Sequence, residues 1–410
     1  MKVNVDRAII KFIFLFPIGT ILSNIPLLGG IVNKFLYFFL ILLLILALIR
    51  RPMLKTDVTA LALLFVTFIY DCILTGTTIY NSNELFYLVT WVIYLIYVRS
   101  NYDLFKFYLC EELDYVKYSI VLWELIVGIS FIFPISWSDG GAFYSFSGGQ
   151  HRMDSATIMI FAAILILYRY HNYRKKVLLF AIIPTIAVAL SGARTYLIIV
   201  GVILAIIYYY SNIKHVHRFW VTIIPLIVVG VIIIMSTSVM QERMAEMAVE
   251  RAFFDSQGYN ALTGITSGRS TFWIIDLQQY WKSSFINKIF GNGFNFVRYV
   301  NETYYTTAIW AHNDFINIIC CNGIVGIFLY FYAYLKMVSR VKPYYMDRKV
   351  IIFMTIAFHI CCMFNAMFNM LYSYFAAAVA VPVLLFAMMD DTILPERKMT
   401  RSELDERDNG

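Results

Sequence analysis

Apolar segments of roughly bilayer length recur along this chain, and they constrain its fold more than any other feature. A helix needs about 20 mostly apolar residues to cross the hydrocarbon core of a bilayer. Such segments lie near residues 8–28, 31–49, 57–75, 84–99, 115–134, 154–170, 177–190, 193–210, 219–236, 313–336, 349–368 and 372–389. The chain has 410 residues, of which 60% are hydrophobic and 14% charged, and no water-soluble domain has that balance. The sequence therefore predicts an all-α integral membrane protein with about 12 transmembrane helices.

Lysine and arginine residues predict the orientation of these helices, because cytoplasmic connections carry an excess of both. The amino terminus, every second connection and the carboxyl-terminal tail together contain 24 of the 33 basic residues. The short connections on the other side contain only Lys34, Arg152 and Arg194. Both termini are therefore predicted to be cytoplasmic. The net charge of +7 reflects this topology and does not indicate a nucleic-acid partner.

One long hydrophilic segment interrupts the apolar pattern and divides the chain into four predicted parts. Residues 1–236 contain transmembrane helices one to nine, and residues 237–312 form a long extracytoplasmic loop. Residues 313–389 contain the last three helices, and residues 390–410 form a disordered cytoplasmic tail. Within the loop, the spacing of apolar residues predicts an amphipathic helix over 239–254 and a second helix from Arg269 to about Trp281. A long loop with structure of its own is usually functional.

Three of the arginines on the predicted outer side are candidates for binding a substrate. Arg152 and Arg194 lie in short connections, and Arg269 lies in the long loop. A guanidinium group binds two phosphate oxygens at once and does not lose its proton. Together these arginines would suit a lipid pyrophosphate. Taken singly, each could instead be an interfacial arginine or half of an ordinary ion pair.

His312 directly precedes the tenth apolar segment and is the second candidate for chemistry. A neutral imidazole at the outer interface could accept a proton from a sugar hydroxyl. The alternative is a structural role, since His312, Asn313 and Asp314 could all cap the following helix. Ionisable residues within predicted spans are also functional candidates, although each could be a hydrogen-bonded packing residue. These are Asp71, Glu124 and His359.

Several motifs of common enzyme classes are missing from the sequence. It contains no phosphate-binding Walker loop, no Asp-x-Asp pair on an outer segment, no HExxH motif and no nucleophile elbow. A metal-held nucleotide-sugar donor is therefore not expected, and we predict neither a metal nor a cofactor. The energy for a reaction must come from the substrate itself or from a gradient.

Four residue groups, taken in order, resemble the O-antigen polymerase and O-antigen ligase superfamily, which includes capsule and exopolysaccharide repeat-unit polymerases. The similarity extends from about Gly192 to Gly326. Its groups are Ser191-Gly192-Ala193-Arg194-Thr195, Ser267-Gly268-Arg269 with Trp273, Gly291-Asn292-Gly293-Phe294, and His312-Asn313-Asp314-Phe315 followed by Gly323-Ile324-Val325-Gly326. No single group is specific to this superfamily, but the ordered set of groups on one outward loop is specific to it.

The resemblance implies a metal-independent glycosyltransferase at the outer face of the cytoplasmic membrane of a bacterium. Its donor would be a polyprenyl-pyrophosphate-linked glycan, and a flippase and a chain-length regulator would be partners. Arg194 and Arg269 would neutralise the departing pyrophosphate, and His312 would activate the acceptor hydroxyl. We expect further substrate contacts from Arg152, Trp273, Gly293 and Asn313. The chain departs from the family in offering no second identifiable histidine or acid for the acceptor.

Two alternatives to a repeat-unit polymerase remain open at this point. A ligase, which transfers glycan to another acceptor, shares the same motifs. The Ile-, Lys-, Tyr- and Asn-rich composition favours a polymerase, because it suits a low-GC, single-membrane bacterium without a lipid A core acceptor. A polysaccharide flippase or another transporter would also have about twelve helices. Transporters usually show paired halves with interrupted helices, whereas this chain has one long loop late in the sequence.

Overall fold

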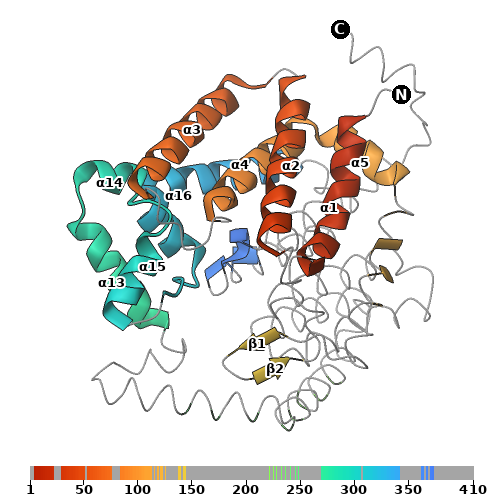
Figure 1. The fold of residues 1–410 in the computed structure, drawn as a ribbon. Helices are drawn as coiled ribbons and strands as arrows, with labels where there is room; N and C mark the ends of the chain where they lie inside the picture. Colours follow the sequence, from red (N-terminus) through yellow and green to blue (C-terminus); the bar gives the residue numbers. More distant parts are fainter. Residues whose placement is uncertain are drawn as a thin grey trace.

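The structure is a computed structural model. It describes residues 4–22, 29–50, 53–75, 84–112, 137–139, 142–144, 269–305, 308–341 and 370–373, together with single residues between them. These parts are helical apart from short connections and one small hairpin (Figure 1). The hairpin pairs β1 (Trp137–Asp139) with β2 (Ala142–Tyr144) in antiparallel register, and Trp137 lies opposite Tyr144. The predicted α-helical fold is confirmed for the described part of the chain.

Five of the apolar segments form helices in the structure. They are α1 (Val5–Leu22), α2 (Gly29–Ile49), α3 (Lys55–Thr75), α4 (Glu84–Ser100) and α16 (Asp314–Val341). Two stretches among the described residues, Lys55–Leu74 and Asp314–Arg340, are long and apolar enough to cross a membrane. The apolar segments between 115 and 236 and after 349 lie largely outside the described residues, so the total of twelve spans stays a prediction.

A further helix, α5 (Tyr102–Glu111), lies in a segment that the sequence analysis treated as a connection. Its buried apolar side chains are Tyr102, Phe105 and Leu109, at the three- and four-residue spacing of one helical face. The end of α5 is tied to the start of α1, because Arg7 pairs with Glu112. That apolar spacing was present in the sequence, but the segment is too short to register as a span.

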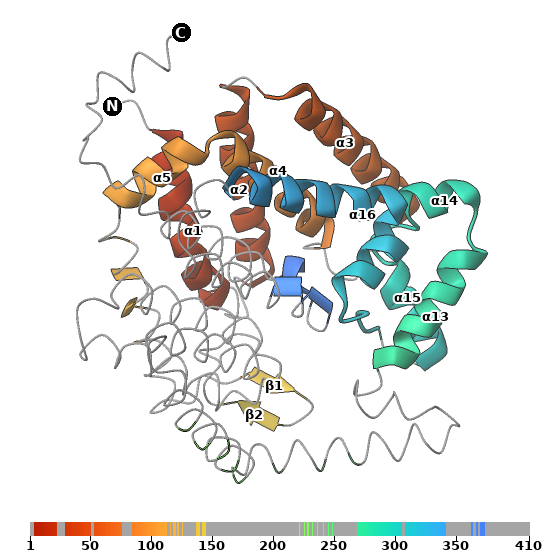
Figure 2. The ribbon, with the colours of Figure 1, turned by 180° about the vertical axis from the view of Figure 1, so that it is seen from behind.

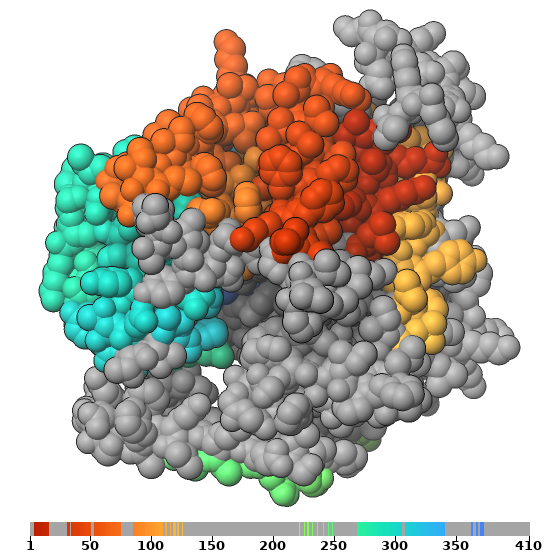
Figure 3. Space-filling view, in the orientation of Figure 1, coloured from red at the N-terminus to blue at the C-terminus, as the bar shows by residue number. Residues whose placement is uncertain are grey.

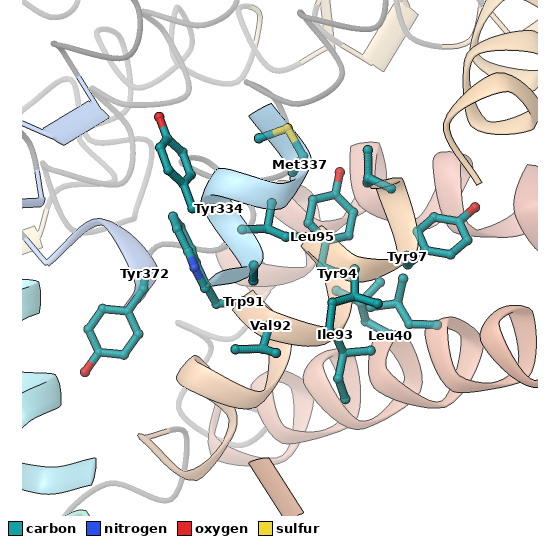
Figure 4. Close-up of a cluster of buried hydrophobic side chains, with 14 of the residues drawn as sticks. Leu40, Trp91, Val92, Ile93, Tyr94, Leu95, Tyr97, Tyr334, Met337 and Tyr372 are labelled. Carbon is teal, nitrogen blue, oxygen red and sulfur yellow. The ribbon is translucent and has the colours of Figure 1, made fainter. Parts of the chain in front are cut away.

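Helix α4 lies between α2 and α16 and forms the centre of the hydrophobic core (Figure 4). Every residue from Thr90 to Val98 is buried, as is typical of a helix surrounded by other helices. The ring of Trp91 stacks on Tyr330 of α16, with centroids 4.5 Å apart. The indole N–H of Trp91 also donates to the Tyr330 carbonyl at 3.2 Å. These contacts fix α16, which begins two residues after the predicted catalytic histidine, against the core.

Polar contacts join the helix ends that the lysine and arginine pattern assigns to one side. Asp57, at the start of α3, pairs with Arg99 at the end of α4 and accepts a hydrogen bond from the Tyr332 hydroxyl at 2.9 Å. Arg340, near the end of α16, lies 3.0 Å from Asp103 at the start of α5. The helices therefore have the relative directions that the predicted alternation requires. Which of these ends faces the cytoplasm stays a prediction.

Helix α16 is broken at Gly323, where φ is 68° and ψ is −166° (Figure 2). The break leaves carbonyl groups of the preceding turn without helical partners. The loop Gly291–Gly293 supplies the missing donors, since the N–H groups of Asn292 and Gly293 donate to the carbonyls of Cys320 and Cys321, each at 3.1 Å. Buried backbone carbonyls need such partners. The loop motif and the helix break therefore form one structural unit.

Glycine is required where this loop meets α16. A Cβ atom on Gly291 would overlap the carbonyl oxygen of Cys321, and one on Gly323 would overlap the backbone of Ile289. Gly291 and Gly293 also have left-handed φ values, of 99° and 90°. The two Gly-rich groups in the sequence are thus explained by a close backbone approach between them.

We expect Gly291→Ala to destabilise the protein by about 2–5 kcal/mol. A left-handed non-glycine residue costs about 1–2 kcal/mol, and relieving the overlap with the Cys321 carbonyl costs about 1–3 kcal/mol more. The measurement is thermal unfolding of the purified protein in detergent. Ile324→Ala is the control, because this neighbour of Gly323 is exposed. Equal stability of the two variants would contradict the close approach.

Candidate functional site

The described part of the long loop, residues 269–305, contains three short helices that pack against α3 and α16 (Figures 1 and 3). They are α13 (Arg269–Lys282), α14 (Phe285–Phe290) and α15 (Phe296–Tyr305). Helix α13 lies where the sequence predicts a helix, whereas α14 and α15 were not predicted. Ser284 caps α14 by accepting a hydrogen bond from the Asn287 N–H at 3.2 Å, and a serine before an apolar run is a usual start signal. The loop is thus a compact layer of helices.

One polar contact fixes the loop to the carboxyl-terminal end of α3, and a second joins that end of α3 to α16. The Tyr70 hydroxyl donates to the Asn287 side-chain oxygen at 2.6 Å, and the Asn322 amide donates to Asp71. Asn287 in turn donates to the side chain of Asn292 at 3.0 Å. Asp71 was a functional candidate, and the structure gives it a packing role between α3 and α16.

Helix α13 brings Arg269 towards the segment that contains His312. The indole N–H of Trp273 donates to the Ala311 carbonyl at 2.5 Å, across 38 residues of sequence. Arg269 precedes Trp273 by four residues, so it lies on the same helix face and about 6 Å further along the axis. The hydrogen bond therefore places Trp273 beside the residue that precedes His312, and Arg269 lies one turn before Trp273 on the same helix.

Arg269 is the first residue of α13, and its position adds to its positive charge. The N-terminus of a helix carries a partial positive charge, which favours an anionic partner. The guanidinium and the helix end together suit a phosphate group near the start of α13. The indole N–H of Trp273 binds the Ala311 carbonyl. The main role of Trp273 is therefore to position the segment before α16.

His312 has an unusual backbone conformation. Its φ is 52°, and it is one of two non-glycine residues with positive φ among the described residues. Left-handed conformations are uncommon outside glycine and tend to occur at functional sites. The following residue, Asn313, caps α16, since its side-chain oxygen accepts from the N–H groups of Phe315 at 3.0 Å and Ile316 at 3.2 Å. The sequence left open whether His312, Asn313 or Asp314 caps α16, and the structure shows that Asn313 does.

The fully buried carboxylate of Asp314 fixes the start of α16. One of its oxygens accepts from the Tyr330 hydroxyl at 3.0 Å and from the backbone N–H of Tyr372 at 3.2 Å. Tyr372 belongs to the short 3₁₀ helix η4 (Leu371–Ser373). The other residue with positive φ, Met370 at 58°, directly precedes η4. Asp314 thus links the two strained positions, His312 and Met370, although they are far apart in sequence.

Several predicted site residues lie outside the described part of the chain. Arg194 and Arg152 belong to this group, as do Glu124, His359 and the amphipathic helix predicted at 239–254. The convergence of Arg194 with Arg269 and His312 therefore stays a prediction. Gly293 is described, and its N–H binds the Cys321 carbonyl. Its predicted contact with substrate stays a prediction, as do those of Asn313 and Trp273.

Sequence reasoning missed Asp276, a buried acid beside this site. Its side chain lies on the face of α13 that also carries Trp273 and Tyr280, and it is 0% exposed. Burial raises the pKa of the Asp276 carboxyl to about 8, and the neighbouring Asn301 amide lowers it only in part. The signal was visible in the sequence, since Asp276 interrupts an apolar stripe at positions 273, 277 and 280.

One family model matches the segment that contains these groups. Residues 178–331 match the family model for O-antigen ligase. This segment is therefore similar to the O-antigen polymerase and ligase superfamily. No curated protein sequence matches the chain. The matched segment includes α13 to α15 and the first half of α16, so it contains Arg269, His312 and the Gly291–Gly293 loop.

The superfamily that the matched segment resembles indicates the general class of the protein. Its members are integral membrane proteins and glycosyltransferase-like enzymes of polysaccharide biosynthesis. The described helices are consistent with that class, since two of them are long and apolar enough to cross a membrane. The resemblance noted from four residue groups is therefore confirmed at the level of the superfamily. The match does not distinguish a polymerase from a ligase.

Proposed function

We propose that this protein is a polysaccharide polymerase that joins polyprenyl-pyrophosphate-linked repeat units at the outer face of a bacterial cytoplasmic membrane. The observation that supports this most is the hydrogen bond between Trp273 and Ala311, because Arg269 lies one turn before Trp273 and His312 directly follows Ala311. A phosphate-binding group and a proton acceptor are the two functions that such a transfer requires. A ligase with another glycan acceptor is the alternative.

The reaction transfers the growing chain from its lipid pyrophosphate to the incoming unit. A hydroxyl oxygen of the incoming sugar attacks the anomeric carbon of the donor sugar. The bond between that carbon and the phosphate oxygen breaks, and the polyprenyl pyrophosphate leaves with both bonding electrons. His312 accepts the proton of the attacking hydroxyl. No metal is needed, because Arg269 and Arg194 neutralise the charge that develops on the leaving phosphate.

The turn between α13 and α14 suits a donor that is anchored in lipid. Three large apolar side chains are exposed there, namely Trp281, Phe285 and Ile286. The ammonium group of Lys288 lies 5.8 Å from the centre of the Trp281 ring. Exposed aromatic residues beside lysine are typical of the membrane–water interface. A lipid pyrophosphate would have its headgroup at the same depth as this turn.

A turnover assay tests this function directly. Purified protein in detergent, without a gradient, should lengthen a defined lipid-linked oligosaccharide in steps of one repeat unit. Chelation of divalent metals should leave the rate unchanged. Lengthening that needs a second acceptor molecule would favour the ligase. Vesicle transport without any new glycosidic bond would favour the transporter.

The orientation has its own test. Thr303, on α15, should lie outside the cell, and Ser339, near the end of α16, should lie inside; both are exposed. In a cysteine-free background, Thr303→Cys should react with a membrane-impermeant maleimide in intact cells. Ser339→Cys should react only after the membrane is permeabilised. Labelling of Ser339→Cys in intact cells would reverse the proposed topology.

A further inference from the structure

Helix α14 has an exposed apolar face that lies beside the exposed apolar face of α3. On α14, the side chain of Phe285 is 76% exposed, and Ile286 next to it is exposed as well. On α3, Phe65, Ile69 and Ile73 are exposed at the four-residue spacing of one helical face. Because α3 contains a stretch that is long and apolar enough to cross a membrane, this face of α3 suits the acyl chains of a bilayer.

Contacts with Tyr70 fix the level of α14 along α3. The Tyr70 hydroxyl donates to the side-chain oxygen of Asn287 at 2.6 Å, and the Tyr70 ring lies 5.7 Å from the ring of Phe290. Tyr70 precedes Thr75, the last residue of α3, by about 7.5 Å along the helix axis. Both views of the ribbon also show α14 at a level between the two ends of α2 (Figures 1 and 2). Helix α14 therefore lies alongside the predicted spans and not beyond their ends.

The backbone at the carboxyl end of α14 is hydrogen-bonded within the protein. The Asn287 carbonyl accepts from the Gly291 N–H at 2.6 Å, and the Lys288 carbonyl accepts from the Tyr280 hydroxyl at 2.7 Å. The loop that follows donates its own N–H groups to the carbonyls at the break in α16. Irregular backbone is tolerated at membrane depth only where the protein supplies such partners, because acyl chains supply none. This turn meets that condition.

Lys288 and Trp281 mark one boundary of the apolar surface. The Lys288 ammonium lies 5.8 Å from the centre of the Trp281 ring, although Lys288 belongs to α14 and Trp281 to the last turn of α13. The lysine side chain thus extends from α14 back towards α13, where Lys282 is also exposed. Long cationic side chains in an apolar region extend towards the lipid headgroups, and tryptophan is enriched at that level. The two ammonium groups match the negative charge of lipid phosphates.

We propose that α14 is inserted into the outer leaflet of the bilayer, with Phe285 and Ile286 among the acyl chains. Trp281, Lys282 and Lys288 lie at the level of the lipid phosphates. The partner of this surface is therefore bilayer lipid, which covers the exposed face of α14 as it covers that of α3. The choice of the outer leaflet follows from the predicted orientation of α3. The insertion itself does not rest on the proposed function, since it requires only that α3 spans the membrane.

Spin labels on the full-length protein measure this depth directly. In the cysteine-free background, a nitroxide is attached at Phe285→Cys, and the protein is reconstituted into vesicles of phosphatidylcholine and phosphatidylglycerol. Collisions of the label with oxygen, which concentrates in lipid, are compared with collisions with a water-soluble nickel chelate. The ratio of oxygen to nickel collisions should be several-fold higher at Phe285→Cys than at Thr303→Cys, a matched control at an exposed position of α15. Phe65→Cys, on the exposed face of α3, should give a high ratio as well.

Two results at position 285 would overturn the insertion. Nickel collisions as frequent as at position 303 would show that α14 lies in water. A label that neither oxygen nor nickel reaches would show that protein, and not lipid, covers this face. Each labelled variant is first compared with the wild type by size-exclusion chromatography. If Phe285→Cys does not fold, Ile286→Cys, which is also exposed, takes its place.

The level of Trp281 gives a second measurement, on protein without a label. Its contribution to the fluorescence is the difference between the wild type and Trp281→Phe in the same vesicles. Lipids with bromine near the headgroup should quench this contribution more strongly than lipids with bromine near the ends of the acyl chains. Equal absence of quenching by both lipids would place Trp281 in water or inside the protein and would contradict the proposal. Stronger quenching from the chain ends would contradict the level assigned to Trp281 and Lys288.

Discussion

Arg269→Ala should lower the rate of chain growth by about 10²–10³, the usual cost of removing one donor that stabilises a developing negative charge. Arg269→Lys should fail nearly as badly, because lysine offers a point charge where arginine offers two parallel N–H donors to phosphate. The position of Arg269 at the start of α13 supports this expectation, since its guanidinium and the helix end favour the same anion.

The rate is measured with purified enzyme and a defined lipid-linked donor at saturating acceptor. The matched control is Lys282→Ala, which removes a positive charge from the last turn of the same helix. The control should keep near-normal turnover, and all three variants should be produced at the wild-type level. Near-normal polymer from Arg269→Lys would show that a simple charge is enough and that two-point phosphate binding is wrong.

Hydropathy predicted the helices that form the core, because the bilayer imposes a length and a polarity that can be read locally. Helices α3 and α16 follow their apolar runs to within a few residues. The relative directions of α3, α4 and α16 also agree with the lysine and arginine pattern, through contacts such as Asp57 with Arg99. Helix α14 was missed, since six residues are too few for periodicity to register.

The internal geometry of the site depends on contacts between residues that are distant in sequence. That Arg269, Trp273 and His312 act as one group stays a prediction, and nothing local in the sequence indicates that Trp273 binds Ala311. The left-handed backbone at His312 likewise depends on its surroundings, where Asp314 binds the backbone of Tyr372. Asp276 was passed over because only the apolar and aromatic residues of this predicted helix were considered, although an acid within an apolar stripe is the exception that needs a reason.

The Gly291–Gly293 group shows how a family motif can have a structural cause. The sequence singled it out by resemblance and assigned Gly293 to substrate. In the structure, the loop donates to the carbonyls that the break at Gly323 exposes. The glycine group that begins at Gly323 is therefore the structural partner of the Gly291–Gly293 loop. Their role is to place the start of α16, and with it His312, relative to the loop helices.

His312→Ala should lower turnover by about 10²–10⁴ while leaving donor binding largely intact, if His312 is the general base. The wild-type rate should also fall as the pH drops and the imidazole takes up a proton. The measurements are the turnover rate and the donor affinity across a pH series, with the same lipid-linked substrates. Loss of donor binding in proportion to rate would contradict a role in the chemical step.

His312→Asn separates the chemical role from a structural one. Asparagine tolerates the left-handed backbone that position 312 adopts, with φ of 52°. The helix cap is provided by the next residue, Asn313, so it is retained in this variant. The substitution thus keeps the backbone and removes the proton acceptor, and we expect it to be nearly as inactive as His312→Ala. Chain growth near the wild-type rate by His312→Asn would remove histidine from the mechanism and leave the arginines to stabilise the leaving group alone.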